Sequence, residues 1–134
     1  MIGTLRGTLI DRGSDEVIVE VGGVGYRVTV APATVVALGE LGDEVFLHIH
    51  HHYREDDQTL YGFASREERM CFEALISAHG VGPSLGLAIL GVHDPAGLAT
   101  VLATEDLAAW CVVPGVGKKT AQRLLVELKE KLEL

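Results

Sequence analysis

The sequence predicts a two-domain α+β protein in which a small five-stranded barrel is followed by an all-helical domain. Apolar residues alternate with a period of two as far as Phe63 and recur with a period of about 3.6 beyond it. Two short glycine hairpins, at residues 79–83 and 114–118, interrupt the helical part, and each lies between two apolar, helix-like runs. The change of period divides the chain into domains at 1–63 and 64–134, with almost no linker between them.

The first domain contains five short β-branched segments separated by Gly, Asp and Ser turns, a composition typical of strands. We expect a strand around residues 5–9 and further strands at 16–21, 26–30, 44–52 and 59–63. A short helical stretch near Pro32–Leu38 falls between the third and fourth strands. This order fits a five-stranded OB-type barrel. A generic five-stranded barrel or an open sheet fits the same pattern.

Capping signals mark the first helices of the second domain. Ser65 and Glu68 have the spacing of a capping box, which predicts a helix through Ser77. A second helix is expected around Ser84–Leu90, after the first hairpin. Asp94-Pro95 then supplies an N-cap and a proline at the first helical position of a third helix, which extends to about residue 103.

The last two predicted helices enclose the second hairpin. Thr104 is expected to cap the fourth helix, with Glu105 and Asp106 in its first turn. The fifth runs from about 117 to 132, and its apolar residues share one face: Ala121, Leu124, Leu125, Leu128 and Leu132.

The composition, with 48% hydrophobic and 22% charged residues, is that of an ordinary globular protein. No apolar stretch approaches the length of a membrane span, and no basic segment precedes an apolar one at the N-terminus. We therefore expect a cytoplasmic protein without a membrane partner. Cys71 and Cys111 lie in apolar helical contexts without metal-ligand spacing, so we expect both to be buried, reduced thiols.

The net charge of −8 argues against a nucleic-acid partner, but the charge is unevenly distributed. Residues 1–63 hold four Lys/Arg and ten Asp/Glu, whereas residues 64–134 hold seven and nine. Between 115 and 123 there are three bases and no acid. Because salt screens charge within about 8 Å, the local potential decides phosphate binding more than the sum does. An acidic protein with one basic face remains compatible with DNA.

The two hairpins are the candidate phosphate sites. Glycine permits a tight turn between helices, and the second helix then begins with uncovered N–H groups that suit an anion. We expect phosphate contacts from residues in these turns or at the helix starts: Gly80, Val81, Gly82, Ser84, Gly115, Val116 and Gly117. Lys118 and Lys119 add charge beside the second hairpin, and Arg123, four residues further, extends the same face. A simple helix–helix turn is the alternative.

Glycine triplets of this kind are weak evidence when they stand alone. Gly23-Val24-Gly25 repeats the pattern between two strands, where a β-turn is sufficient explanation. The second hairpin also resembles an ATP-binding P-loop superficially. That motif needs Gly at position 112 and Ser or Thr at 119, where this chain has Val112 and Lys119, so we do not expect an ATPase site.

Two clusters in the first domain invite a metal interpretation that we do not favour. Residues 54–57, Arg-Glu-Asp-Asp, lie in the turn between the last two strands, and a solvated acidic turn is favoured over a nuclease metal site. His48, His50 and His52 alternate along one strand and share a face, while His51 points the other way. Without a fourth ligand, a structural or exposed strand face is favoured over metal ligation.

A further set of motifs runs in order through the whole chain: Met1-Ile2-Gly3, residues 20–26, Arg54-Glu55-Asp56 with residues 60–63, and the segments 80–83 and 114–121. Together these motifs resemble the RuvA family, which supplies the junction-binding subunit of a DNA branch-migration machine. The resemblance covers the whole chain without gaps.

The resemblance implies an OB-fold domain and a domain with two helix-hairpin-helix motifs, assembled as a homotetramer that acts singly or as an octamer on DNA. Such a tetramer would hold a four-way (Holliday) junction open and nearly square during recombination and repair. It implies no catalytic residue, metal or cofactor. The hairpin amides, with Lys118, Lys119 and Arg123, would contact phosphates of the arms. Glu55 and Asp56 match the family's acidic pin, which repels phosphates where the strands cross.

The resemblance also implies partners: the RuvB motor and the RuvC resolvase. Family members continue through a flexible linker into a small RuvB-binding domain, which is absent from this chain ending at Leu134. We therefore expect it to bind junctions without recruiting RuvB productively. Ser84 stands where relatives often have lysine, so we expect the first hairpin to bind more weakly or to depend more on its amides.

Two other functions fit the same residues. One is a general helix-hairpin-helix protein that binds duplex DNA without preference for junctions. The other is a metal-dependent junction nuclease that uses Glu55, Asp56 and the histidine strand.

Overall fold

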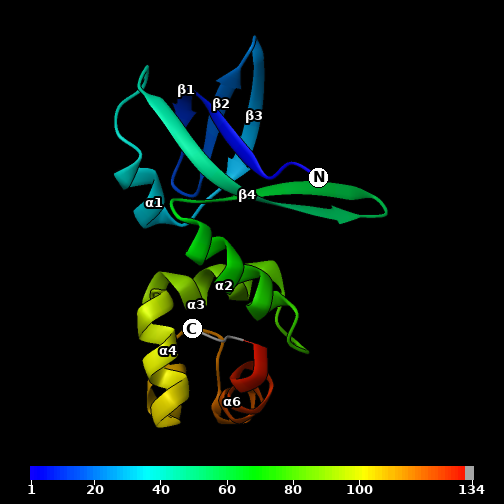
Figure 1. Ribbon diagram of the computed structural model, residues 1–134, viewed down its shortest axis with the longest axis vertical. Coiled ribbons are helices and arrows are strands. Elements are labelled where there is room, and N and C mark those ends of the chain that lie inside the picture. Colours follow the sequence, from blue (N-terminus) through cyan, green and yellow to red (C-terminus); the bar gives the residue numbers. More distant parts are fainter. Residues whose placement is uncertain (132–134) are drawn as a thin grey trace. The chain divides into compact units, whose positions relative to one another are not determined.

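The computed structural model describes residues 1–131, which divide into two compact units, Met1–Arg69 and a second that begins at Met70 (Figure 1). The first unit contains all the strands, one short helix and the start of the next helix, and the second unit has helices and no strand among its described residues. The predicted α+β class is therefore confirmed.

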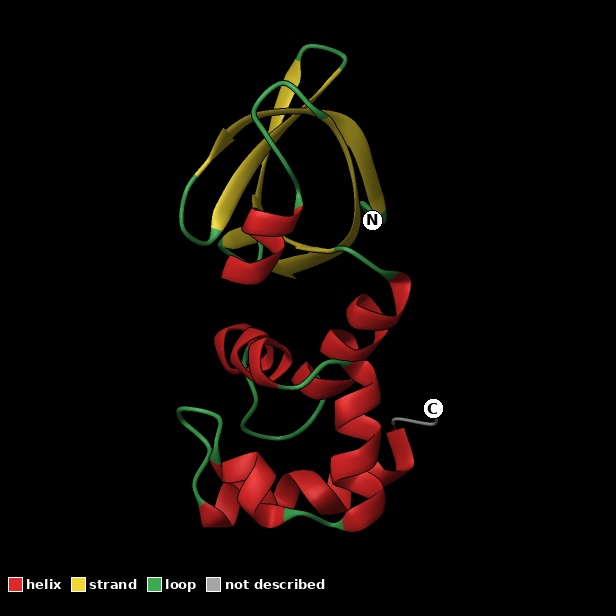
Figure 2. Cartoon of the chain, turned by 90° about the vertical axis from the view of Figure 1, so that its left-hand side faces the viewer, coloured by secondary structure: helices red, strands yellow, loops and turns green. Residues whose placement is uncertain are grey.

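Five strands form a closed barrel in the first unit, in the order β1-β2-β3-β5-β4. Their bounds are β1 Thr4–Arg12, β2 Glu16–Val21, β3 Val24–Thr29, β4 Glu44–Arg54 and β5 Asp57–Phe63. Neighbouring strands are antiparallel except β3 and β5, which run parallel. The helix α1 (Pro32–Ala37) lies across one open end of the barrel, where Val35 is buried (Figure 2). The expectation of an OB-type barrel is confirmed.

The barrel core consists of the alternate residues that the period-two pattern selects. Strand β4 shows this most clearly, because Val45, Leu47 and Ile49 are buried while the residues between them are half-buried. Burying an aliphatic side chain of this size contributes about 1.5–3 kcal/mol to folding. The hydrophobic alternation therefore sets which face of each strand points inward.

Two turns differ from the sequence prediction. The β-turn expected at Gly23–Gly25 lies one residue earlier, at Gly22-Gly23, whose φ angles are 59° and 87°. Two consecutive residues with positive φ make the tight hairpin turn that fits strand twist. The predicted gap between β4 and β5 is also too long, because the ladder continues to the pair formed by Arg54 and Asp57. The side chains at this end of the two strands are polar, because this part of the ribbon packs against no core, so the hydrophobic alternation that predicts a strand is missing there.

Five helices form the second unit and the segment that leads into it. They are α2 Arg66–Ile76, α3 Pro83–Val92, α4 Pro95–Thr104, α5 Leu107–Cys111 and α6 Lys118–Lys131. They surround a core that includes Leu75, Ile89 and Trp110. Two predicted caps are confirmed: the Ser65 hydroxyl accepts a hydrogen bond from the Glu68 amide, and the Asp94 carboxylate accepts one from the Gly97 amide.

Two expectations for this unit are wrong. Thr104 ends α4 instead of capping α5, because Glu105 turns the chain with a left-handed φ of 52°. Asp106 is the cap of α5, accepting a hydrogen bond from the Ala109 amide at 3.1 Å. Cys71 is buried as predicted, but Cys111 is exposed, since α5 is five residues long and turns Trp110 toward the core.

The apolar face predicted for the last helix is present on α6, where Ala121, Leu124 and Leu128 are buried. Leu132 lies outside the described residues. Within residues 1–131, no single helix is long and apolar enough to cross a membrane. The pair α3 and α4 passes that test together by length and composition only, with a bend of 89° between them.

Candidate nucleic-acid interface

The first glycine hairpin joins α2 to α3. Gly80 adopts a φ of +82°, a conformation that glycine tolerates best. The Val81 amide then donates a hydrogen bond to the Ala78 carbonyl at 3.2 Å, which closes the turn. The Val81 side chain is buried, with 6% of its surface exposed. Its side chain therefore anchors the hairpin in the core, and its N–H is engaged by the turn itself.

The second hairpin, between α5 and α6, repeats this geometry. Gly115 has a φ of +93°, and the Val116 amide donates to the Val113 carbonyl at 3.1 Å. Val116 is buried to the same extent as Val81, with 6% exposed. Two segments 35 residues apart thus form the same turn with the same buried anchor.

The helix starts after the two hairpins offer amides to solvent. The first intrahelical acceptors are the Gly82 and Gly117 carbonyls, which accept from Gly86 and Ala121 at 2.9 Å. Amides before those donors have no intrahelical acceptor. The second hairpin therefore presents four amides, at residues 117–120, and the first only three, because Pro83 has no N–H. Both arrangements suit an oxyanion.

Basic side chains are distributed over the hairpins differently from the sequence prediction. Lys118 and Lys119 are exposed at the start of α6, beside the second hairpin, as expected. Arg123 belongs to the first hairpin instead: its Nη1 donates to the His79 carbonyl at 3.1 Å. A Cβ placed on Gly80 would lie 2.8 Å from the same nitrogen. Lys119 therefore lies at the second hairpin, while Arg123, one turn further along α6, contacts the first.

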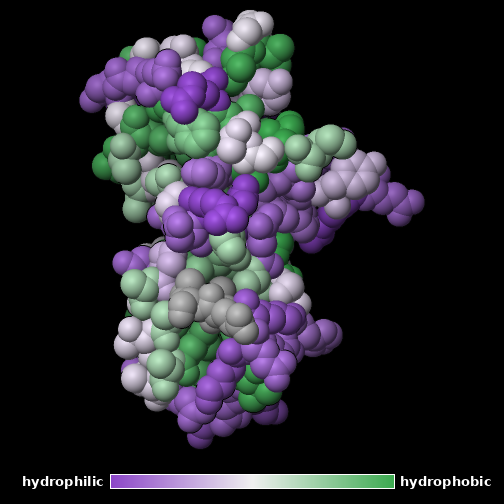
Figure 3. Space-filling model, in the orientation of Figure 1, coloured by the Kyte–Doolittle hydropathy of each residue, from purple (hydrophilic) through white to green (hydrophobic). Residues whose placement is uncertain are grey.

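The acidic turn is the tip of the β4–β5 hairpin, which projects beyond the rest of the barrel (Figure 1). Glu55 and Asp56 are its two central residues, and both are exposed. In the part of the chain that the structure describes, neither side chain forms an ion pair or a hydrogen bond. The projecting tip carries hydrophilic surface (Figure 3). Two unneutralised carboxylates thus occupy the end of a two-stranded ribbon.

The histidines of β4 are arranged on its two faces as the alternation predicts. On one face, the His50 Nε2 and His52 Nδ1 atoms are 3.4 Å apart, and the ring of Tyr61 lies beside both. His51, on the other face, contacts the Gln58 side-chain oxygen at 2.8 Å. Within residues 1–131, no three His, Cys, Asp or Glu side chains lie close enough to hold a metal ion.

The pKa of His52 lies below the ordinary histidine value. Its partial burial disfavours the charged form most, and the neighbouring His50 and Arg54 oppose a further positive charge. The neutral ring accepts a hydrogen bond from the Arg54 Nε at 3.3 Å. His52 therefore supports Arg54 at the base of the acidic turn as an uncharged acceptor.

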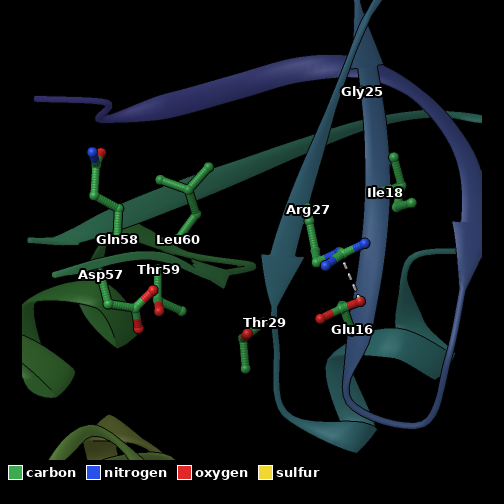
Figure 4. A pocket seen from close by; sticks show the side chains of 9 residues that line it. All are labelled: Glu16, Ile18, Gly25, Arg27, Thr29, Asp57, Gln58, Thr59 and Leu60. Atoms are coloured by element: carbon green, nitrogen blue, oxygen red, sulfur yellow. Dashed lines mark ion pairs between the residues drawn. The ribbon is translucent and has the colours of Figure 1, made fainter.

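A hollow that sequence reasoning missed lies between β3 and β5 (Figure 4). Its volume is about 620 Å³, and an ion pair between Arg27 and Glu16, 3.3 Å long, crosses its wall. The hollow exists because β3 and β5 pair over only two residues, at Val28 and Thr29. No local pattern in either strand encodes such a short pairing.

A closed five-stranded barrel followed by two helix-hairpin-helix turns defines the class of this protein. The first 62 residues match the model of the RuvA N-terminal domain, and residues 72–130 match the SAM-like helix-hairpin-helix tandem. The likeness continues in whole proteins described as Holliday junction branch migration complex subunit RuvA. The chain is 47% identical to that of Shewanella halifaxensis and 44% identical to that of Vibrio cholerae, over 99% of its length. The protein of Magnetococcus marinus is 47% identical over 98%.

The chain therefore carries a RuvA N-terminal domain followed by a helix-hairpin-helix tandem, and it is similar to RuvA proteins along nearly all of its length. It spans 65% of the length of each of these three relatives.

Proposed function

We propose that this chain is a non-catalytic, structure-specific DNA-binding protein that recognises four-way junctions as a homotetramer. The whole protein acts in the cytoplasm as the DNA-binding subunit of branch migration, with RuvB as motor and RuvC as resolvase, and this chain supplies its junction-binding part. The names of the relatives, which describe Holliday junction branch migration subunits, support this role. The observation that carries it is the presence of two opposite chemistries in one chain: two hairpins with amides uncovered at the helix starts that follow them, and an acidic tip at Glu55 and Asp56.

The hairpins hold the duplex arms in this proposal. Each presents a row of amides to a phosphate, with the exposed Lys118 and Lys119 beside the second hairpin and the half-buried Arg123 against the first. Charge-assisted hydrogen bonds of this kind contribute about 1.5–3 kcal/mol each, so a few per hairpin give useful affinity. Because backbone amides read no base sequence, the binding is independent of sequence.

The acidic tip provides the preference for a junction. A carboxylate 4 Å from a phosphate is repelled by about 1 kcal/mol even in water, and by more where water is excluded. Four copies of Glu55 and Asp56 at the centre of a tetramer therefore oppose any DNA that places phosphates there. An open crossover avoids that repulsion, whereas a continuous duplex does not.

A comparison of a four-way junction with a linear duplex of matched arms, titrated at several salt concentrations, tests the function. We expect tighter binding of the junction at every salt concentration. Equal affinity for both would leave a general helix-hairpin-helix duplex binder. Mass measurement of the protein with and without junction distinguishes a tetramer from an octamer on DNA.

Neutralising the acidic tip tests the source of the preference. Glu55→Gln together with Asp56→Asn keeps the shape of the turn and removes its charge. We expect junction affinity to be kept and duplex affinity to rise about tenfold, measured by gel shift. Loss of all DNA binding would contradict the repulsion model. Incision of labelled junction in Mg²⁺ or Mn²⁺, abolished by Glu55→Gln, would establish the nuclease alternative instead.

A further inference from the structure

Three side chains of α6, spaced four residues apart, contact the segment that leads into the first hairpin. Arg123 donates to the His79 carbonyl at 3.1 Å. The Glu127 Oε2 accepts from the His79 amide at 2.8 Å. The Lys131 Nζ donates to the Ser77 carbonyl at 3.3 Å. Since residues four apart lie on the same face of a helix, these three form one continuous row along α6.

The contacts of Glu127 and Arg123 fix one peptide group on each side of the same residue. His79 directly precedes Gly80, whose left-handed φ of +82° creates the hairpin. A residue with both its N–H and its C=O held has little freedom left in φ and ψ. The row on α6 therefore determines how the first hairpin enters its turn, and with it the direction of the amides that follow.

The position of Glu127 is unexpected for a site that binds phosphate. A carboxylate this close to an anion site repels the ligand. The exposed His79 amide does not need a carboxylate for its hydrogen bond, because water can accept it. We propose that Glu127 is a positioning residue, which orients the first hairpin for phosphate through the His79 amide. Its charge is offset by Arg123 and Lys131, the cations one turn before and one turn after it. This inference rests on the proposed function, because it assumes that the hairpin binds DNA phosphate.

The second hairpin supports the proposal because it has no backbone N–H at the corresponding position that would need an acceptor. Pro114 takes the place there that His79 has in the first hairpin, directly before the left-handed glycine. Proline has no N–H, and its ring restricts φ without a partner. At this position the proline ring therefore restricts the backbone of the second hairpin, whereas in the first hairpin side chains of α6 hold the same position.

Two substitutions at Glu127 separate positioning from charge. Glu127→Gln keeps an oxygen acceptor for the His79 amide and loses the negative charge, while Glu127→Ala loses both. We expect the Gln variant to bind a four-way junction as tightly as the unmodified chain or up to threefold more tightly. The Ala variant should bind about threefold to tenfold more weakly. A purely electrostatic effect would instead strengthen both variants equally, as it should for the control Glu130→Gln on the same helix.

Amide hydrogen exchange in the free protein gives a readout independent of DNA. We expect the His79 amide to exchange at least tenfold faster in Glu127→Ala and near the original rate in Glu127→Gln, with core amides unchanged in both. Unchanged His79 exchange in the Ala variant, or equal affinity of the two variants for the junction, would overturn the proposal. If the exchange rates change as expected but the unmodified chain does not prefer junctions, the proposed function fails while the positioning of His79 by Glu127 stands.

Discussion

The two glycine hairpins have the same backbone and different surroundings. Both turn at a left-handed glycine and anchor a buried valine, at Val81 and Val116. The second carries its cations, Lys118 and Lys119, in the helix that it starts. The first takes its cation from α6, in which Arg123 lies 44 residues after His79. The local sequence therefore supplies the amides of both hairpins, but it supplies the cations of the second hairpin only.

This difference assigns the hairpins different dependence on tertiary structure. The second hairpin has its amides and its two lysines whenever α6 forms, because all of them belong to the first turn of that helix. The first is complete only while α6 lies against it, through the contacts that Arg123 and Glu127 make with His79. Loosening the helical unit should thus weaken the first site before the second.

The largest effect is expected at the second hairpin. Lys118→Gln together with Lys119→Gln removes both of its cations and leaves its four amides. We expect junction affinity to fall at least tenfold, because each charge-assisted phosphate contact contributes about 1.5–3 kcal/mol. The slope of log affinity against log salt should become shallower by about 0.9 for each lysine that no longer neutralises a phosphate. Fluorescence anisotropy over a salt series measures both quantities.

A matched control lies on the same helix. Lys129→Gln makes the same change of charge at a residue that pairs with Glu105 at 2.6 Å, away from the hairpin. Its effect on affinity should be small. An unchanged salt slope in the double variant would mean that phosphate binds elsewhere and that the hairpins differ less than their charges indicate.

The elements of the fold were predictable where the information is local. Alternation in β4 and the caps at Ser65 and Asp94 depend on residues within one or two turns, and the structure confirms them. The cap of α5 was misassigned because Thr104 and Asp106 both suit an N-cap. The choice between them depends on where α4 ends, at the left-handed Glu105. A non-glycine residue in that conformation gives little sign of it in the sequence.

The candidate site divides in the same way. The turns and their glycines were predictable, since two of them recur in the same helical context. Lys119 and Arg123 share one face of α6, as their spacing of four predicted, but the spacing says nothing about what lies opposite each of them. Which hairpin Arg123 serves depends on how α6 packs in the unit. For the same reason, Glu127 gave no signal as a site residue.

Glycines at the helix starts test the feature that the hairpins share. A Cβ added at Gly82 or Gly117 would meet nothing within 4 Å, and neither residue has a left-handed φ. Gly82→Ala and Gly117→Ala should therefore cost less than about 1 kcal/mol of folding stability. Each should still weaken junction binding by about fivefold, because the methyl group holds a phosphate away from the exposed amides. Thermal unfolding and anisotropy measure the two effects separately.

The control for these variants is Gly91→Ala, which adds a methyl group in open space on α3, away from both hairpins. It should leave DNA affinity unchanged. A fivefold loss at Gly117 with none at Gly82 would break the comparison, because it would show that the shared backbone is used for phosphate at only one hairpin.

The smallest expected effect is a gain at the first hairpin. Ser84 is exposed in the first turn of α3, two residues after Gly82, in the position that Lys119 has at the second hairpin. Ser84→Lys therefore supplies the local cation that the first hairpin lacks. We expect affinity for the junction to rise about threefold and the salt slope to steepen by about 0.9, as for one added phosphate contact. The same substitution at Ser14, in the turn between β1 and β2, should leave both quantities unchanged. An equal gain from Ser14→Lys would assign the effect to net charge, and the first hairpin would then be limited by its geometry and not by its missing cation.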